Sequence, residues 1–175
     1  MLSLLNRWKK DKKGVAAVEF AIVAVPFFMA IIGILETCLF FAAGSALEGA
    51  AHDAARVLRT GQAQKSGDPL AMFEDRMCGT VGIIVNCADI TYEVVEIPAD
   101  GFYGVSDFDP TFDVDGNLES QGFESGGVES TILVRLFYRY EFMTPFVGHM
   151  MGDEIGNSYG HMSTVVLRNE PYAFE

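Results

Sequence analysis

The chain has 175 residues, 50% of them hydrophobic, and a formal net charge of −12. This length allows a membrane-spanning helix and one small globular domain. The acidic balance argues against a nucleic-acid-binding protein, because phosphate binding needs clustered lysine and arginine. Residues 1–13 hold five basic residues and one aspartate, which gives +4, so the rest of the chain carries −16.

A long apolar run follows this basic segment and predicts a membrane-spanning helix. Residues 20–35 are almost wholly apolar, and the apolar character resumes from Cys38 to Leu47. At about 1.5 Å per residue the run exceeds the roughly 30 Å of a bilayer core, and it is longer than the about 7–15 apolar residues of a cleaved secretory signal. Basic residues favour the cytoplasmic side, so the acidic part should lie in the periplasm of a bacterium with two membranes.

The helix is expected to continue past the membrane to Thr60, with Gly61 as its stop. Apolar residues recur at helical spacing along this part, at Leu47, Ala51, Ala54 and Leu58. The sequence therefore predicts one helix over residues 15–60, half in lipid and half beneath a domain.

Two acids interrupt the apolar run. Glu19 is costly so deep in a membrane helix, where a carboxylate is seldom found without a partner. Glu36 lies about 100° away from Glu19 around the helix. Two interpretations of Glu36 stay open: it marks the outer membrane interface, or it reaches a neighbouring subunit.

The segment around Glu19 resembles the processing site of type IV prepilins, especially those of the Flp/Tad (tight adherence) class. It reads Gly14, four small or aliphatic residues, Glu19 and Phe20, directly after the basic cluster. The resemblance implies that a prepilin peptidase cuts between Gly14 and Val15, and that Glu19, followed by Phe20, becomes the fifth residue of the mature chain. Glu19 of one subunit would then neutralise the new Val15 amine of another.

Further stretches resemble TadE-type pseudopilins: residues 33–36, the alanine-rich residues 46–56 and the C-terminal residues 163–172. The resemblance implies a minor pilin that supports adhesion and biofilm formation and is no enzyme. Its expected partners are the peptidase, other Flp/Tad pilins and pseudopilins, and the inner-membrane assembly platform. It would cross the inner membrane once, with the N-terminus cytoplasmic and the C-terminal domain periplasmic, before incorporation into an extracellular pilus. A TadF-like role stays open.

Three cysteines are present. Cys78 and Cys87 lie in the exported part, nine residues apart, where an oxidising compartment favours a disulfide. A zinc site at this pair would lack two further ligands. Cys38 lies inside the membrane helix and is expected to pack as a small apolar residue.

The remaining pattern predicts an α+β, pilin-like fold, in which the long helix packs on a small antiparallel sheet. We expect a leader at residues 1–14, the helix at 15–60 and the extracytoplasmic domain at 61–175. Within the domain, residues 62–67 read as a linker, and Asp68 and Pro69 start a helix over residues 70–78, with Leu70, Phe73 and Met77 inward. Alternation predicts strands over residues 89–97, 130–144 and 158–169, with an irregular segment after Pro145.

The sequence gives little support for metal or cofactor binding. Residues 98–129 read as a long acidic surface loop, whose residues 107–116 resemble a calcium loop but lack its first and last anchoring ligands. His149 and His161, each before a methionine, make a copper site conceivable. We find no motif for nucleophilic catalysis or phosphate binding and expect no catalytic residues. The alternative function is an uncleaved, membrane-anchored periplasmic binding module whose acidic loop binds calcium or a partner.

Overall fold

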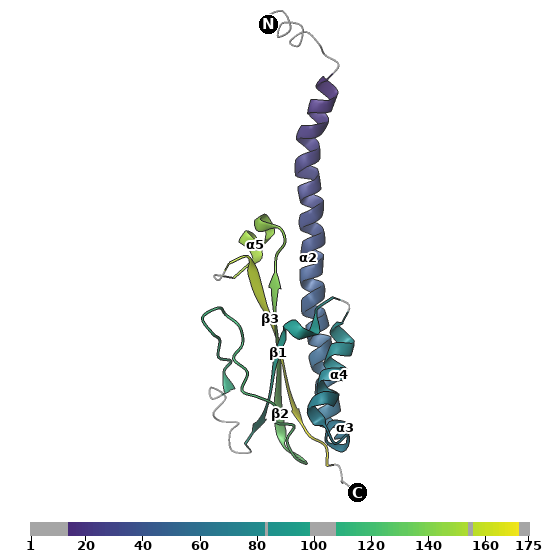
Figure 1. Ribbon diagram of the computed structural model, residues 1–175, viewed down its shortest axis with the longest axis vertical. Coiled ribbons are helices and arrows are strands. Elements are labelled where there is room, and N and C mark those ends of the chain that lie inside the picture. The colour runs from purple at the N-terminus through teal and green to yellow at the C-terminus, as the bar shows by residue number, and fades with distance from the viewer. Residues whose placement is uncertain (1–13, 83, 99–107, 154–155, 172–175) are drawn as a thin grey trace, which may run out of the picture.

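The computed structural model describes residues 14–82, 84–98, 108–153 and 156–171. One helix, α2 (Val15–Arg59), extends far beyond a small domain of three strands and shorter helices (Figure 1). This is the predicted α+β arrangement of a long N-terminal helix on a three-stranded antiparallel sheet. The helix is continuous through Pro26 and ends one residue before the predicted Thr60, and Gly61 follows in the left-handed conformation with φ 73°.

The two halves of α2 have opposite environments. From Val15 to Leu35 nearly every side chain is exposed, whereas the predicted inward residues of the second half are buried, namely Leu47, Ala51, Ala54 and Leu58. Ala50, Ala55 and Val57 are buried as well, because α2 packs against α4 in addition to strands β2 and β3. Alanines suit this position because their small side chains let neighbouring elements approach closely.

Helix α4 (Pro69–Val81) begins as predicted, with the Asp68 carboxylate accepting a hydrogen bond of 3.0 Å from the Ala71 amide. It continues three residues beyond the predicted end. Phe73 and Met77 are buried as expected, but the predicted inward position of Leu70 is wrong, because this residue is exposed and Val81 completes the buried stripe.

The predicted linker is also partly wrong. Residues Gln62–Lys65 form a one-turn helix, α3, directly after the Gly61 turn. The turn forms because Ala63 is fully buried in the main core beside α4, which fixes the backbone of this polar segment.

The sheet is an antiparallel meander in the order β1 (Ile90–Ile97), β2 (Thr131–Glu141), β3 (Ser158–Arg168). The predicted strand at 130–144 is therefore three residues too long at its C-terminal end. The alternating residues Ile132, Val134 and Leu136 of β2 are fully buried in one core with α2 and α4.

The opposite face of the sheet is covered too. Phe112, which a short bridge pairs with Leu118, contacts Phe137 edge to face on this side. Phe123 instead pairs with Val94 along the free edge of β1 and packs against Phe73 in the main core. The expected surface loop thus forms a second layer in its described part. Residues 99–107 of that loop lie outside the described residues.

A short helix, α5 (Pro145–Met151), occupies the segment that was expected to be irregular. Pro145 takes the first helical position, where its missing N–H costs nothing. Val147 is buried with Phe40 and Phe142 in a second core cluster, and this contact accounts for a helix that the Gly/Met/His-rich sequence does not favour.

Candidate functional site

The candidate processing segment forms the start of α2. Gly14 is the residue that precedes the helix, and its carbonyl accepts a hydrogen bond of 3.1 Å from the Val18 amide. A side chain at Gly14 would meet no atom within 4 Å, so the position is sterically open. Val15 and Phe20 are exposed, and Phe20 is 72% accessible. Residues 1–13 of the expected leader lie outside the described residues.

The helix that carries this segment is long and apolar enough to cross a membrane. Its exposed first half, residues 15–35, would measure about 31 Å, close to the thickness of a bilayer core. No contact with the described part of the chain buries the most apolar stretch. Such a surface needs lipid or other helices around it.

Glu19 and Glu36 differ sharply in their surroundings. Glu19 is exposed on the bare half of α2 and has no hydrogen-bond or ion-pair partner within the described part of the chain. Glu36, by contrast, is only 3% accessible. The carboxylate of Glu36 is therefore buried within this domain, whereas that of Glu19 would be buried only by lipid or by other helices.

Glu36 is satisfied by backbone groups of its own domain. Its Oε1 accepts hydrogen bonds from the amides of Met143 and Thr144, and its Oε2 lies 3.1 Å from the Thr144 nitrogen. These amides lie at the turn between β2 and α5. The carboxylate is therefore turned into its own domain and not toward a neighbouring subunit, while its position at the outer membrane interface stays a prediction.

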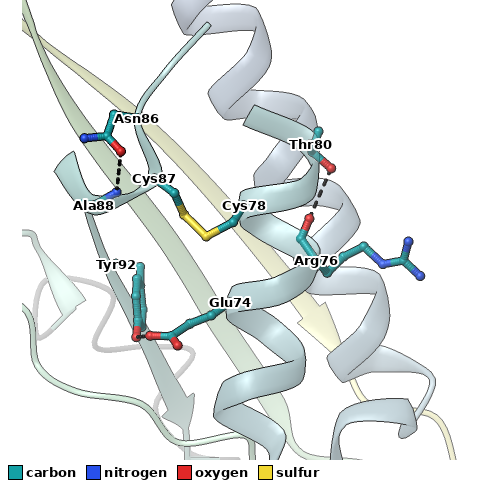
Figure 2. Close-up of a disulfide and its surroundings, with 8 residues drawn as sticks. All are labelled: Glu74, Arg76, Cys78, Thr80, Asn86, Cys87, Ala88 and Tyr92. Carbon is teal, nitrogen blue, oxygen red and sulfur yellow. Dashed lines mark hydrogen bonds between the residues drawn. A yellow bond between two sulfur atoms is a disulfide. The ribbon is translucent and has the colours of Figure 1, made fainter. Parts of the chain in front are cut away.

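The predicted cysteine pair is joined. Figure 2 shows the disulfide between Cys78, near the end of α4, and Cys87, at the start of the 3-10 turn before β1. The Cα atoms of the two cysteines lie 5.3 Å apart. Nearby, the Tyr92 hydroxyl donates a hydrogen bond to Glu74, a second link between α4 and β1. Burial and the adjacent carboxylate raise the pKa of Tyr92 to about 12. Cys38 is free and exposed on α2, and its expected packing as a small apolar residue of the membrane helix stays a prediction.

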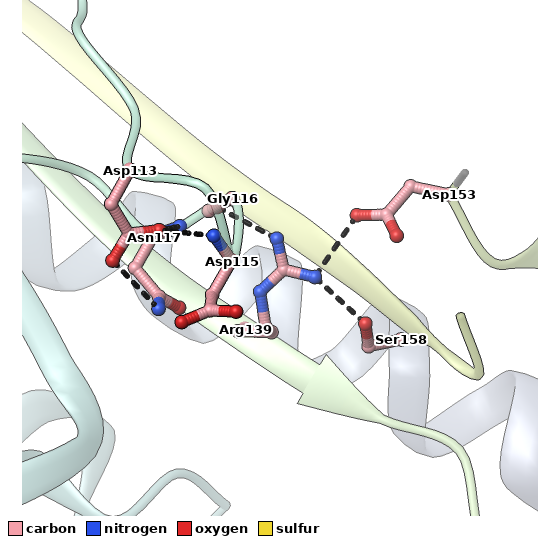
Figure 3. A network of polar contacts seen from close by, with 7 residues as sticks. All are labelled: Asp113, Asp115, Gly116, Asn117, Arg139, Asp153 and Ser158. Carbon is pink, nitrogen blue, oxygen red and sulfur yellow. Dashed lines mark hydrogen bonds and ion pairs between the residues drawn. The ribbon is translucent and has the colours of Figure 1, made fainter. Parts of the chain in front are cut away.

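The acidic segment considered for calcium is organised by its own hydrogen bonds. The Asp113 carboxylate accepts bonds from the Asp115 amide at 2.9 Å and the Asn117 amide at 2.8 Å (Figure 3). The Asn117 amide is the main reason that the pKa of Asp113 is lowered. In the described ranges, no three His, Cys, Asp or Glu side chains converge on a position for a metal ion.

Arg139 holds this segment onto the sheet. Its guanidinium donates to the Gly116 carbonyl at 2.7 Å and to the Ser158 hydroxyl at 2.7 Å, and it pairs with Asp153 at 3.2 Å (Figure 3). Deeper on the same face, Arg135 and Glu93 form a buried ion pair. Arg135 also donates to the Phe108 carbonyl, and the Glu93 carboxylate accepts from the Gln121 amide. These contacts stabilise the covering layer.

His161, the second histidine of the conceivable copper site, packs against α2. Its ring lies 4.5 Å from the ring of Phe40, centroid to centroid, and a side chain at Gly44 would come within 3.0 Å of it. Burial lowers the pKa of His161, although a hydrogen bond with the Phe40 backbone acts in the opposite direction. His149 is exposed on α5. His161 therefore occupies a packing position, whereas His149 lies at the surface.

The C-terminal step fastens the sheet to the end of α2. The buried Asn169 donates to the Gly127 carbonyl at 2.8 Å, and the Glu170 amide donates to the Arg59 carbonyl at 2.9 Å. Arg59 and Glu170 also form an exposed ion pair at 3.3 Å. The residues directly after β3 thereby close the domain onto the long helix.

Comparison with known proteins places the candidate segment in a family context. Residues 14–56 match the family model described as TadE-like protein. The matched range runs from the candidate cleavage site through the exposed half of α2 and into the half that packs on the sheet. No curated protein and no solved structure matches the chain.

Proposed function

We propose that this TadE-like protein of the Tad/Flp pilus system is a minor pilin, or pseudopilin, that is processed by a prepilin peptidase and then joins the assembling pilus. It starts as a single-pass inner-membrane protein with its acidic domain in the periplasm. It supports adhesion and biofilm formation through the pilus. The family is structural rather than catalytic, and the proposed mechanism is accordingly one of assembly.

Cleavage after Gly14 would change the electrostatics of the start of α2. It would remove the carbonyl that accepts from the Val18 amide and would create an ammonium group at Val15. The N-terminus of a helix already carries a partial positive charge, so the new cation adds to it. In a setting of low dielectric constant such a charge is costly unless a carboxylate lies near.

Glu19 is the carboxylate best placed to answer this need. Its exposure on the bare half of α2, without a partner in the described chain, is the observation that carries the proposal. Glu36 is already occupied by the amides of Met143 and Thr144. Pairing of Glu19 with the Val15 amine of a neighbouring subunit would require an axial offset of about 6 Å between their helices. The ion pair would thereby help to set the register of the bundle.

The first experiment determines the mature N-terminus. Mass spectrometry of the N-terminal peptide should give Val15 in cells with an active prepilin peptidase and Met1 in cells without it. The Gly14→Leu variant should keep the precursor mobility on a gel. Retention of Met1 in the peptidase-positive strain would refute processing and would favour the uncleaved binding module.

The second experiment separates processing from assembly. Glu19→Ala should be cleaved normally but should be depleted from sheared pili, with reduced piliation and surface attachment. Glu48→Ala is the matched control, because Glu48 is an exposed acid on the domain half of the same helix. Normal piliation in the Glu19→Ala strain would contradict the role given to this carboxylate.

A further inference from the structure

Helix α5 lies beside the end of the exposed half of α2. A side chain at Gly33 would meet Val147 Cγ2 at 3.6 Å, and the Thr37 hydroxyl lies 4.0 Å from the sulfur of Met151. Figure 1 places α5 at the end of the sheet that faces the N-terminal half of α2. Since residues 15–35 would span about 31 Å, α5 lies at the depth where the outer boundary of a bilayer core would fall.

The outward face of α5 is apolar. Phe146 and Met150, four residues apart and therefore on one side of the helix, are 64% and 71% accessible. Met143, just before α5, is 80% accessible. Val147, about 100° away from Phe146 around the helix, is buried against Phe40 and Phe142. The helix thus attaches to the domain through Val147 and leaves Phe146 and Met150 uncovered.

An apolar groove joins this face to the surface of α2. It has a volume of about 570 Å³ and is lined by Pro26, Ala30 and Gly33 from α2 and by Phe146, Val147 and Met150 from α5, among others. The α2 side of the groove belongs to the half that is apolar enough to cross a membrane. The uncovered face of α5 is therefore continuous with a surface that lipid would surround.

The charges near α5 are compatible with contact with lipid. No Asp, Glu, Lys or Arg occurs in Pro145–Met151. The nearby acid Glu36 is buried, and its carboxylate accepts from the amides of Met143 and Thr144. An ionised group directed at the acyl chains would oppose insertion, and here the carboxylate is turned into the domain.

We propose that α5 and Met143 dip into the outer leaflet of the membrane, with phospholipid acyl chains filling the groove between α5 and α2. Aromatic and aliphatic side chains on one side of an interfacial helix are the usual means of such insertion. The domain then has two membrane contacts, the spanning helix and the apolar surface formed by α5 and Met143. The proposal requires α2 to lie in a bilayer but does not depend on peptidase processing or on a pilus.

Depth-dependent fluorescence quenching tests this contact in the full chain. The sequence has one tryptophan, Trp8, so a Trp8→Phe background allows single reporters. The variants are Phe146→Trp, the lipid control Ile34→Trp on α2 and the aqueous control Val114→Trp, at a residue that is 96% accessible on the covering segment. Each is reconstituted into phosphatidylcholine vesicles with and without bromine on the acyl chains.

The expected result is strong quenching of Phe146→Trp by brominated chains, comparable to that of Ile34→Trp, with little effect on Val114→Trp. Quenching of Phe146→Trp should not change with the protein-to-lipid ratio. Quenching that falls as this ratio rises would show that another copy of the chain covers α5 and would overturn the assignment to lipid. An unquenched Phe146→Trp, or an unquenched Ile34→Trp, would also overturn it.

Discussion

The Glu36 carboxylate lies 3.0 Å from the Thr144 amide nitrogen, although the two residues are 108 positions apart in the chain. Together with the bond from the Met143 amide, this contact attaches the turn between β2 and α5 to the long helix. A side chain that first resembles a second membrane acid is therefore a structural acceptor for two backbone donors. Loss of the Glu36 carboxylate should therefore destabilise the domain.

Glu36→Ala should lower the free energy of unfolding by about 2 kcal/mol or more, because each buried donor that loses its acceptor costs about 1–3 kcal/mol. Glu36→Gln keeps one acceptor oxygen and should cost less. Thermal unfolding of the full chain in detergent micelles measures the difference. Exposed Glu48→Ala is the control and should stay within about 0.5 kcal/mol of the wild type. Equal melting temperatures for Glu36→Ala and Glu48→Ala would contradict this role.

Removal of the disulfide should destabilise the domain by about 2.5–3 kcal/mol, the value expected for a closed loop of about ten residues. The test is denaturant unfolding of the variant with Cys78→Ser and Cys87→Ser, beside wild type with and without reductant. Cys38→Ser is the matched control, since Cys38 is free and exposed. A reductant effect that persists in the double variant would point to a cause other than this bridge.

The Arg135–Glu93 pair should show strong coupling. Both side chains are buried, so Glu93→Gln alone leaves an uncompensated guanidinium and should cost about 3–5 kcal/mol. The double variant Glu93→Leu and Arg135→Met should recover much of this loss. The exposed pair Arg59–Glu170 is the comparison, and its disruption should cost at most about 1 kcal/mol. Additive losses in the buried pair would refute the coupling.

His161 should make stability depend on pH in the mildly acidic range. Burial lowers the pKa of His161 in the folded protein below the ordinary histidine value of 6.5, so the unfolded chain binds the proton first. The stabilising contribution is therefore complete above the unfolded pKa and is lost as pH falls through the folded pKa. Histidine titrates over a range of about pH 8 to pH 5. As the pH is lowered through this range, the melting temperature of His161→Phe should fall less steeply than that of wild type. Parallel curves would exclude this residue as a source of the dependence.

The long helix, its end and the strands could be predicted because periodicity and local signals determine them. Asp68 and Pro69 start α4, Gly61 ends α2, and the alternation in β2 identifies the face that lies on the helices. These features depend on residues close together in the sequence. The same local information gave no reason to distinguish the exposed Leu70 from Phe73.

The features that sequence reasoning missed depend on pairings between distant residues. Glu93 and Arg135 lie far apart in the sequence, and only the register between β1 and β2 makes them direct partners. Similarly, α5 is too short and too poor in helix formers to be recognised, and Val147 holds it by packing against Phe40 and Phe142. The role of Glu36 likewise depends on contacts with distant residues, the amides of Met143 and Thr144. The proposed cleavage at Gly14 and pairing at Glu19 stay predictions.

The continuity of α2 has a mechanical consequence. Because one unbroken helix passes from Val15 to Arg59, the axial position and the rotational orientation of the domain are linked to those of the membrane-spanning half of α2. Deleting one residue between the two halves would turn the domain by about 100° and shift it by about 1.5 Å relative to the anchor. Tension applied to either end would reach the other without an intervening hinge.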